Sequence, residues 1–175
     1  MFQAFRQFGP VLMVPAAWTT AILAVNTEIL PDQGLLIAHI VMSVLMTVFL
    51  LTGWKQMKEG VLKAWRTVIT IGLPVTVLGA LGLTGIQTEL FTAVLPLGWV
   101  ILPGLALVYT GKKDESFGTG YTVSGLLSLL GLHLFTVSLV YPAGQKLLSV
   151  SGLFAVLFGQ SAGIFLAAYQ NYGPE

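Results

Sequence analysis

Six long apolar stretches, separated by short polar segments, dominate the chain. They lie at about residues 11–30, 34–54, 67–88, 90–110, 119–141 and 147–170. A helix that crosses a bilayer needs about 20 mainly apolar residues, and each stretch approaches or exceeds that length. The sequence therefore predicts an all-α integral membrane protein, in which one bundle of six transmembrane helices forms a single domain over residues 1–175.

The composition supports a multi-pass membrane protein. Apolar residues make up 55% of the chain and charged residues only 9%, with a mean hydropathy of +0.87. Soluble domains carry about 25% charged residues. A net charge of +1 is too small to attract nucleic acid, so the lipid bilayer is the expected partner. The absence of cysteine from the sequence excludes disulfides, thiolate metal sites and cysteine nucleophiles.

The basic residues predict how the chain is oriented. Lys and Arg collect in the cytoplasmic loops of membrane proteins. Of the eight Lys and Arg residues, only Lys146 lies between stretches on the opposite side. The others lie before the first stretch or after the second and fourth: Arg6, Lys55, Lys58, Lys63, Arg66, Lys112 and Lys113. Both termini are therefore expected to be cytoplasmic, in a plasma (inner) membrane.

The basic segment 54–66 has a pattern of its own. Trp54, Met57, Val61 and Trp65 share one face of a helix, with charged residues between them. This pattern predicts a short helix lying in the inner headgroup region. A partner-binding helix is the alternative.

Charged residues are absent from the deep parts of all six stretches. There is consequently no lysine for a retinal Schiff base and no carboxylate relay for a proton pump. Two histidines without nearby carboxylates are too few for a three-ligand zinc site. We therefore expect neither an enzyme nor a metal site.

Neutral polar side chains lie near the middle of the stretches instead. Thr20, Thr76, Trp99 and Gln160 are the candidates to line a pore, because a small polar solute must replace the water contacts that it loses. Alternatively, Ser and Thr bond their own helix or join neighbouring helices. Gln160 and Trp99 are the stronger candidates, since a buried amide or indole N–H needs a partner.

Four prolines interrupt these helices. Each lacks an N–H and frees a carbonyl four residues earlier. Pro15, Pro74, Pro96 and Pro103 thus free the carbonyls of Val11, Thr70, Thr92 and Trp99. Protein or water must satisfy such groups inside a membrane, and kinked helices of this kind line cavities as well as packed interfaces.

His39 and His133 are the only histidines, and both lie within apolar stretches at a similar depth from the same side. Three interpretations are open. The pair could ligate a haem, could act as an external pH switch, or could be neutral residues hydrogen bonded to their neighbours.

Two segments carry a resemblance to a known family. The first stretch contains Gly9-Pro10-Val11-Leu12, then Trp18-Thr19-Thr20-Ala21-Ile22-Leu23 and Asn26, and the sixth contains Gly159-Gln160-Ser161-Ala162 and Ile164-Phe165-Leu166-Ala167. Together with six stretches and a basic loop after the second, these segments resemble the acetate uptake transporter family, small monocarboxylate and succinate channels and carriers. Only Pro10 remains of that family's N-P-A-P-L-G motif. The resemblance implies passage of a small monocarboxylate.

The sequence leaves three functions open. The first is a channel or transporter for a small polar or anionic solute, with a pore within each protomer. A homo-oligomer is expected, because so small a bundle has much lipid-facing surface to pair. The second is a non-catalytic accessory subunit of a larger membrane complex. The third is a bis-histidine haem-binding membrane subunit; without haem, no cofactor is expected.

Overall fold

The computed structural model describes residues 2–26, 29–86 and 88–172. Its six α-helices are α1 (Phe2–Asn26), α2 (Asp32–Gly53), α3 (Gly60–Leu83), α4 (Thr88–Lys113), α5 (Gly118–Val140) and α6 (Gln145–Tyr172), with the short 3-10 helix η1 (Pro142–Gly144) before α6. The all-α prediction is confirmed. The helices extend beyond the predicted stretches at several ends, most at α1 and α3.

Five of these helices are long and apolar enough to cross a membrane. The qualifying segments are Asp32–Gly53, Gly60–Leu83, Leu95–Lys113, Gly118–Val140 and Pro142–Gln170. In α1 the corresponding apolar segment, Gly9–Val25, is shorter. The chain is therefore a multi-pass helical membrane protein.

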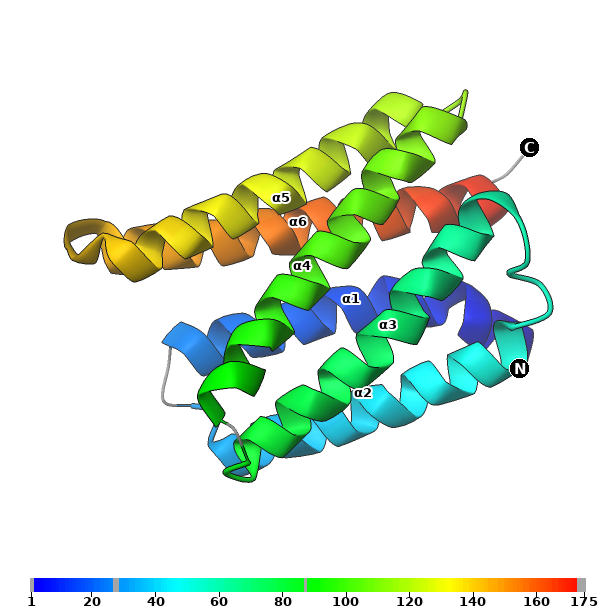
Figure 1. Cartoon of the computed structure of the whole chain (residues 1–175). Coiled ribbons are helices and arrows are strands. Elements are labelled where there is room, and N and C mark those ends of the chain that lie inside the picture. The colour runs from blue at the N-terminus through cyan, green and yellow to red at the C-terminus, as the bar shows by residue number, and fades with distance from the viewer. Residues whose placement is uncertain (1, 27–28, 87, 173–175) are drawn as a thin grey trace.

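The helices pack in an order that differs from their order along the chain. Neighbours in sequence from α2 to α6 pack pairwise, and α1 packs mainly against α6 rather than α2 (Figure 1). The α5–α6 hairpin makes the most extensive contact, and α2 lies at the periphery against α3. The N-terminal helix is thus brought beside the C-terminal one, where their polar side chains can meet.

Glycines allow the α5–α6 hairpin to pack closely. A Cβ added at Gly131 would lie 2.5 Å from the Gly152 carbonyl oxygen, and one added at Gly159 would lie 2.6 Å from the Ser124 carbonyl oxygen. A methyl group at either position would force the backbones apart. Small residues are what permit such close helix contact in a bilayer.

The ends of the bundle differ in charge. The start of α1, the α2–α3 connection, the α4–α5 turn and the end of α6 lie at one end of the bundle (Figure 1). This end carries the basic segment 55–66 together with Lys112 and Lys113, whereas Lys146 lies at the other end, at the start of α6. The basic residues after α2 and α4 therefore lie at one end of the bundle and Lys146 at the other, as their positions between the apolar stretches predict.

The prediction of a separate interfacial helix over 54–66 is wrong. Residues 54–59 form turns and bends, and α3 begins at Gly60. Gly60 has φ +56°, and Glu59 before it is extended, so the chain reverses here instead of continuing as a helix. Arg66 of α3 packs on Trp54 at the other end of this connection, with its guanidinium 4.6 Å from the centroid of the Trp54 ring.

Candidate functional site

A network of neutral polar side chains joins five of the six helices inside the bundle. The Trp18 indole N–H on α1 donates to Gln160 Oε1 on α6 at 2.9 Å. The Gln160 amide nitrogen donates to the Trp99 carbonyl oxygen on α4 at 2.9 Å and to Ser128 Oγ on α5 at 3.1 Å. The Trp99 indole N–H in turn donates to Thr76 Oγ1 on α3 at 3.0 Å. We call these five residues the mid-span network.

The chemistry of its partners determines the orientation of the Gln160 amide. An indole N–H can only donate and a backbone carbonyl can only accept. Gln160 must therefore turn its oxygen to Trp18 and its nitrogen to the Trp99 carbonyl, as observed. Gln160 is only 3% exposed, so a reversed amide would leave buried groups unpaired.

Pro103 explains why the Trp99 carbonyl is available. In a regular helix, this carbonyl would accept the N–H of residue 103, which proline lacks. Pro103 lies inside α4, and the side chain of Gln160 supplies the missing donor from α6. The predicted freed carbonyl at Trp99 is thus satisfied by a neighbouring helix.

The network is closed, with its groups paired to one another. Thr76 Oγ1 also donates to the Gly72 carbonyl at 3.0 Å, and the Trp99 ring packs directly on Gly72, where an added Cβ would lie 2.7 Å from the ring. The Trp18 ring also packs in an apolar core with Val100, Leu153 and Val156. Tryptophan rings and core side chains therefore occupy the space around the polar groups.

Three of the four predicted pore candidates belong to this network: Thr76, Trp99 and Gln160. The fourth, Thr20, does not, because its hydroxyl donates to the Ala16 carbonyl of its own helix at 2.9 Å. Trp18 was not among the candidates. The requirement of a buried indole N–H for a partner, which singled out Trp99, applies equally to Trp18 and could have found it.

The structure does not bring the two histidines together. His39 on α2 pairs its Nδ1 with the Leu35 carbonyl at 2.8 Å and lies against Gly79 of α3. His133 is exposed on α5, and α2 and α5 are not packed against each other. This placement does not support the hypotheses that need both histidines at one site within a chain. Haem ligation by the pair is the main one. Among the residues described, no cluster of three or more His, Asp or Glu could hold a metal ion.

A second polar cluster lies at the α4–α5 turn. Asp114 Oδ1 accepts the backbone N–H groups of Phe117 at 2.7 Å and Ser116 at 3.1 Å. Its Oδ2 accepts the Gln170 amide at 2.9 Å, and Gln170 Oε1 accepts the Tyr121 hydroxyl at 2.5 Å. The Phe117 N–H, then the Gln170 amide and the Ser116 N–H, hold the pKa of Asp114 below its ordinary value of 3.8. The turn is thereby tied to the end of α6.

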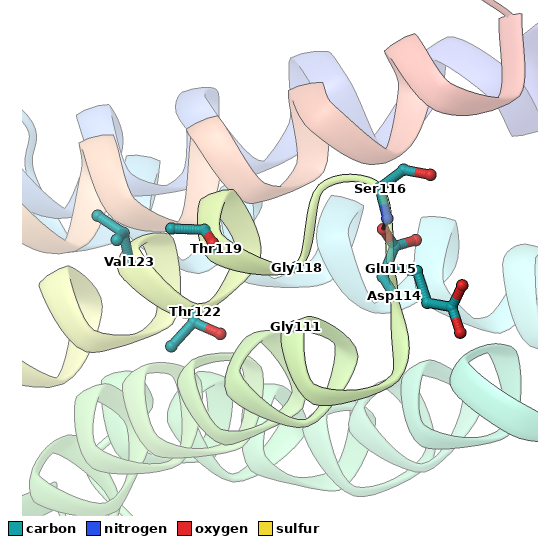
Figure 2. A pocket seen from close by; sticks show the side chains of 8 residues that line it. All are labelled: Gly111, Asp114, Glu115, Ser116, Gly118, Thr119, Thr122 and Val123. Carbon is teal, nitrogen blue, oxygen red and sulfur yellow. Dashed lines mark hydrogen bonds between the residues drawn. The ribbon is translucent and has the colours of Figure 1, made fainter.

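A pocket of about 380 Å³ borders this turn. Figure 2 shows Thr122 on the side of α5 near Gly111 of α4, and Thr119 and Val123 on the side towards α6. Both carboxylate oxygens of Asp114 are already used by the turn and by Gln170. The polar side chains that remain on its lining are three hydroxyls and Glu115, beside glycines and Val123, and we assign the pocket no ligand.

No protein-family model matches the chain, and neither a curated protein nor a solved structure matches it. The resemblance to the acetate uptake transporter family accordingly stays a prediction from the residues of the first and sixth apolar stretches.

Proposed function

We propose that this chain is a six-span membrane protein with its basic end in the cytoplasm, and that it passes a small polar solute without catalysing a reaction. The mid-span network is the closed constriction of that passage. One observation carries the proposal: three polar residues from separate helices, Thr76, Trp99 and Gln160, converge inside the bundle and are linked by hydrogen bonds. The charge segregation supports the orientation.

The donors of the network suit a small carboxylate such as acetate. The indole N–H groups of Trp18 and Trp99 have no acceptor function, and the Gln160 amide and two hydroxyls add further donors. These groups carry no charge that would hold an anion too tightly to release. In the closed arrangement the indole and amide donors are paired with acceptors of the bundle itself, so passage requires α6 to withdraw Gln160 from α4.

Flux measurements in proteoliposomes test this proposal. Vesicles that contain the protein should take up labelled acetate faster than empty vesicles, and urea serves as a neutral solute of similar size. The Gln160→Leu variant removes the amide that closes the constriction, so the uptake rate should rise at least about threefold, the effect of one net hydrogen bond. The Ser151→Ala variant, an exposed hydroxyl on the same helix, is the matched control. Uptake equal to that of empty vesicles for both solutes contradicts the proposal.

A second candidate is a non-catalytic accessory subunit of a larger membrane complex. The observation that favours it is the mutual pairing of the donors and acceptors in the mid-span network, which packing between helices alone would explain. The peripheral α2 offers an apolar face with Ile37, Val41 and Val44 more than half exposed. Gentle purification distinguishes the two: a homo-oligomer that migrates alone favours the passage, and stable co-purification with unrelated chains favours the subunit.

A further inference from the structure

A cation without an anionic partner among the described residues lies at the basic end of the bundle, where α2 turns into α3. The Arg66 guanidinium packs over the Trp54 ring, 4.6 Å from its centroid. In the part of the chain that the structure describes, no carboxylate or carbonyl oxygen pairs with this guanidinium. A guanidinium carries five N–H donors, and stacking on an aromatic ring leaves its edges free to donate. Arg66 is therefore held in position with its donors available.

The position of Trp54 determines the depth of this pair in the membrane. The 22 residues of α2 are about 33 Å long at 1.5 Å per residue, slightly more than a hydrocarbon core of about 30 Å. Trp54 directly follows the last residue of α2, so it lies at the edge of that core, where tryptophan is enriched. Arg66 is the last charged residue of α3 before the apolar run that begins at residue 67. The guanidinium therefore lies beside the lipid headgroups.

The charge around the pair favours an anion. Segment 54–66 carries three lysines besides Arg66 and a single acidic residue, Glu59. Lys63 is exposed and precedes Arg66 by three residues on α3, so the two cations share one face of the helix. A negatively charged ligand at this depth of a bilayer is the headgroup of a lipid.

We propose that Arg66, Trp54 and Lys63 bind the headgroup of an anionic phospholipid. The Arg66 guanidinium donates to two phosphate oxygens, a geometry that its planar fork matches. Lys63 lies nearer the start of α3 and disfavours a headgroup that ends in a cation such as choline. The acyl chains run along α2 past Leu51, which lies three residues before Trp54 and is 77% exposed. The proposal requires only that the chain spans a membrane, and it does not depend on solute passage.

Native mass spectrometry of the purified full chain tests the proposal. The probes are dioleoylphosphatidylglycerol and dioleoylphosphatidylcholine, which share their acyl chains and phosphate and differ in the net charge of the headgroup. A basic residue close to an anionic lipid surface strengthens binding by about fivefold. We expect the parent protein to bind the phosphatidylglycerol at least about fivefold more tightly than the phosphatidylcholine. Equal binding of the two lipids would overturn the proposal.

Two substitutions that remove the same charge locate the site. Arg66→Gln should lower the affinity for phosphatidylglycerol at least about fivefold. Lys112→Gln removes one positive charge at the same end of the bundle, from the last turn of α4, and should lower this affinity less than about twofold. Equal losses in the two variants would overturn the proposal, because they would show attraction by the overall charge of that end.

A substitution that keeps the charge tests the role of the ring. Trp54→Leu leaves Arg66 charged but removes the ring over which its guanidinium packs. Trp54 is 47% exposed, so this variant should fold, and it should bind phosphatidylglycerol about threefold more weakly than the parent. An unchanged affinity would overturn the proposal, because the ring would then not hold the guanidinium at the phosphate.

Discussion

Gln160 on α6 donates a hydrogen bond to the backbone carbonyl of Trp99, which has no helical donor because residue 103 is a proline. The same amide accepts from Trp18, 142 residues away in sequence, so a single side chain connects the first helix to the fourth and sixth. Polar groups in the hydrocarbon region must find partners within the protein. Pro103 in α4 and the glutamine on α6 are therefore complementary.

Replacing Gln160 should destabilise the bundle. Gln160→Leu leaves the Trp18 N–H and the Trp99 carbonyl buried without partners and should lower the free energy of unfolding by about 2 kcal/mol. Unfolding in detergent micelles measures this change. Gln145→Leu, at the exposed start of α6, should change stability by less than about 0.5 kcal/mol. Equal effects of the two substitutions would show that the network contributes nothing specific.

A double-mutant cycle tests the role of Pro103. Pro103→Ala supplies a backbone N–H to the Trp99 carbonyl, so that this carbonyl no longer needs Gln160. Gln160→Leu should then cost about 0.5 to 1 kcal/mol less in the Pro103→Ala background than in the parent. Pro96→Ala, which restores a donor to a carbonyl outside the mid-span network, should show no such coupling. An identical cost of Gln160→Leu in all backgrounds would contradict the pairing.

The absence of cysteine from the sequence makes the orientation directly measurable. Single variants Lys55→Cys and Lys146→Cys place thiols at opposite ends of the bundle. With the basic end cytoplasmic, a membrane-impermeant maleimide added to intact cells should label Lys146→Cys at once and Lys55→Cys only after permeabilisation. The reverse pattern would place the basic end outside.

Acid should loosen the α4–α5 turn. The pKa of Asp114 is held below its ordinary value by the Phe117 N–H, the Gln170 amide and the Ser116 N–H. The stability that this carboxylate contributes is therefore present above the unfolded-state pKa and is lost as pH falls through the lower folded-state value. Asp114→Asn should be less stable than the parent near pH 6, and the difference should shrink on acidification below about pH 4. A difference that does not vary with pH would contradict this account.

Some expectations failed for reasons that lie outside any local pattern. The spacing of Trp54, Met57, Val61 and Trp65 is helical, yet the left-handed backbone of Gly60 ends the α2–α3 turn and starts α3 there. His39 and His133 have similar depths, but depth along a helix does not determine which helices are neighbours. His39 lies on α2 and His133 on α5, and α3 and α4 pack between these two helices.

The sequence by itself determined that this chain is helical and resides in a membrane, because apolar length and the lack of deep charge are properties of each segment alone. It also identified Trp99 and Gln160 as polar groups in need of partners, Thr76 as a pore candidate, and Pro103 as the source of a free carbonyl. Only the tertiary structure decided that these needs satisfy one another, and that Trp18 joins them while Thr20 does not. The physical reason is that a hydrogen bond between helices depends on which helices are adjacent and how each is rotated, and packing across the whole chain sets both.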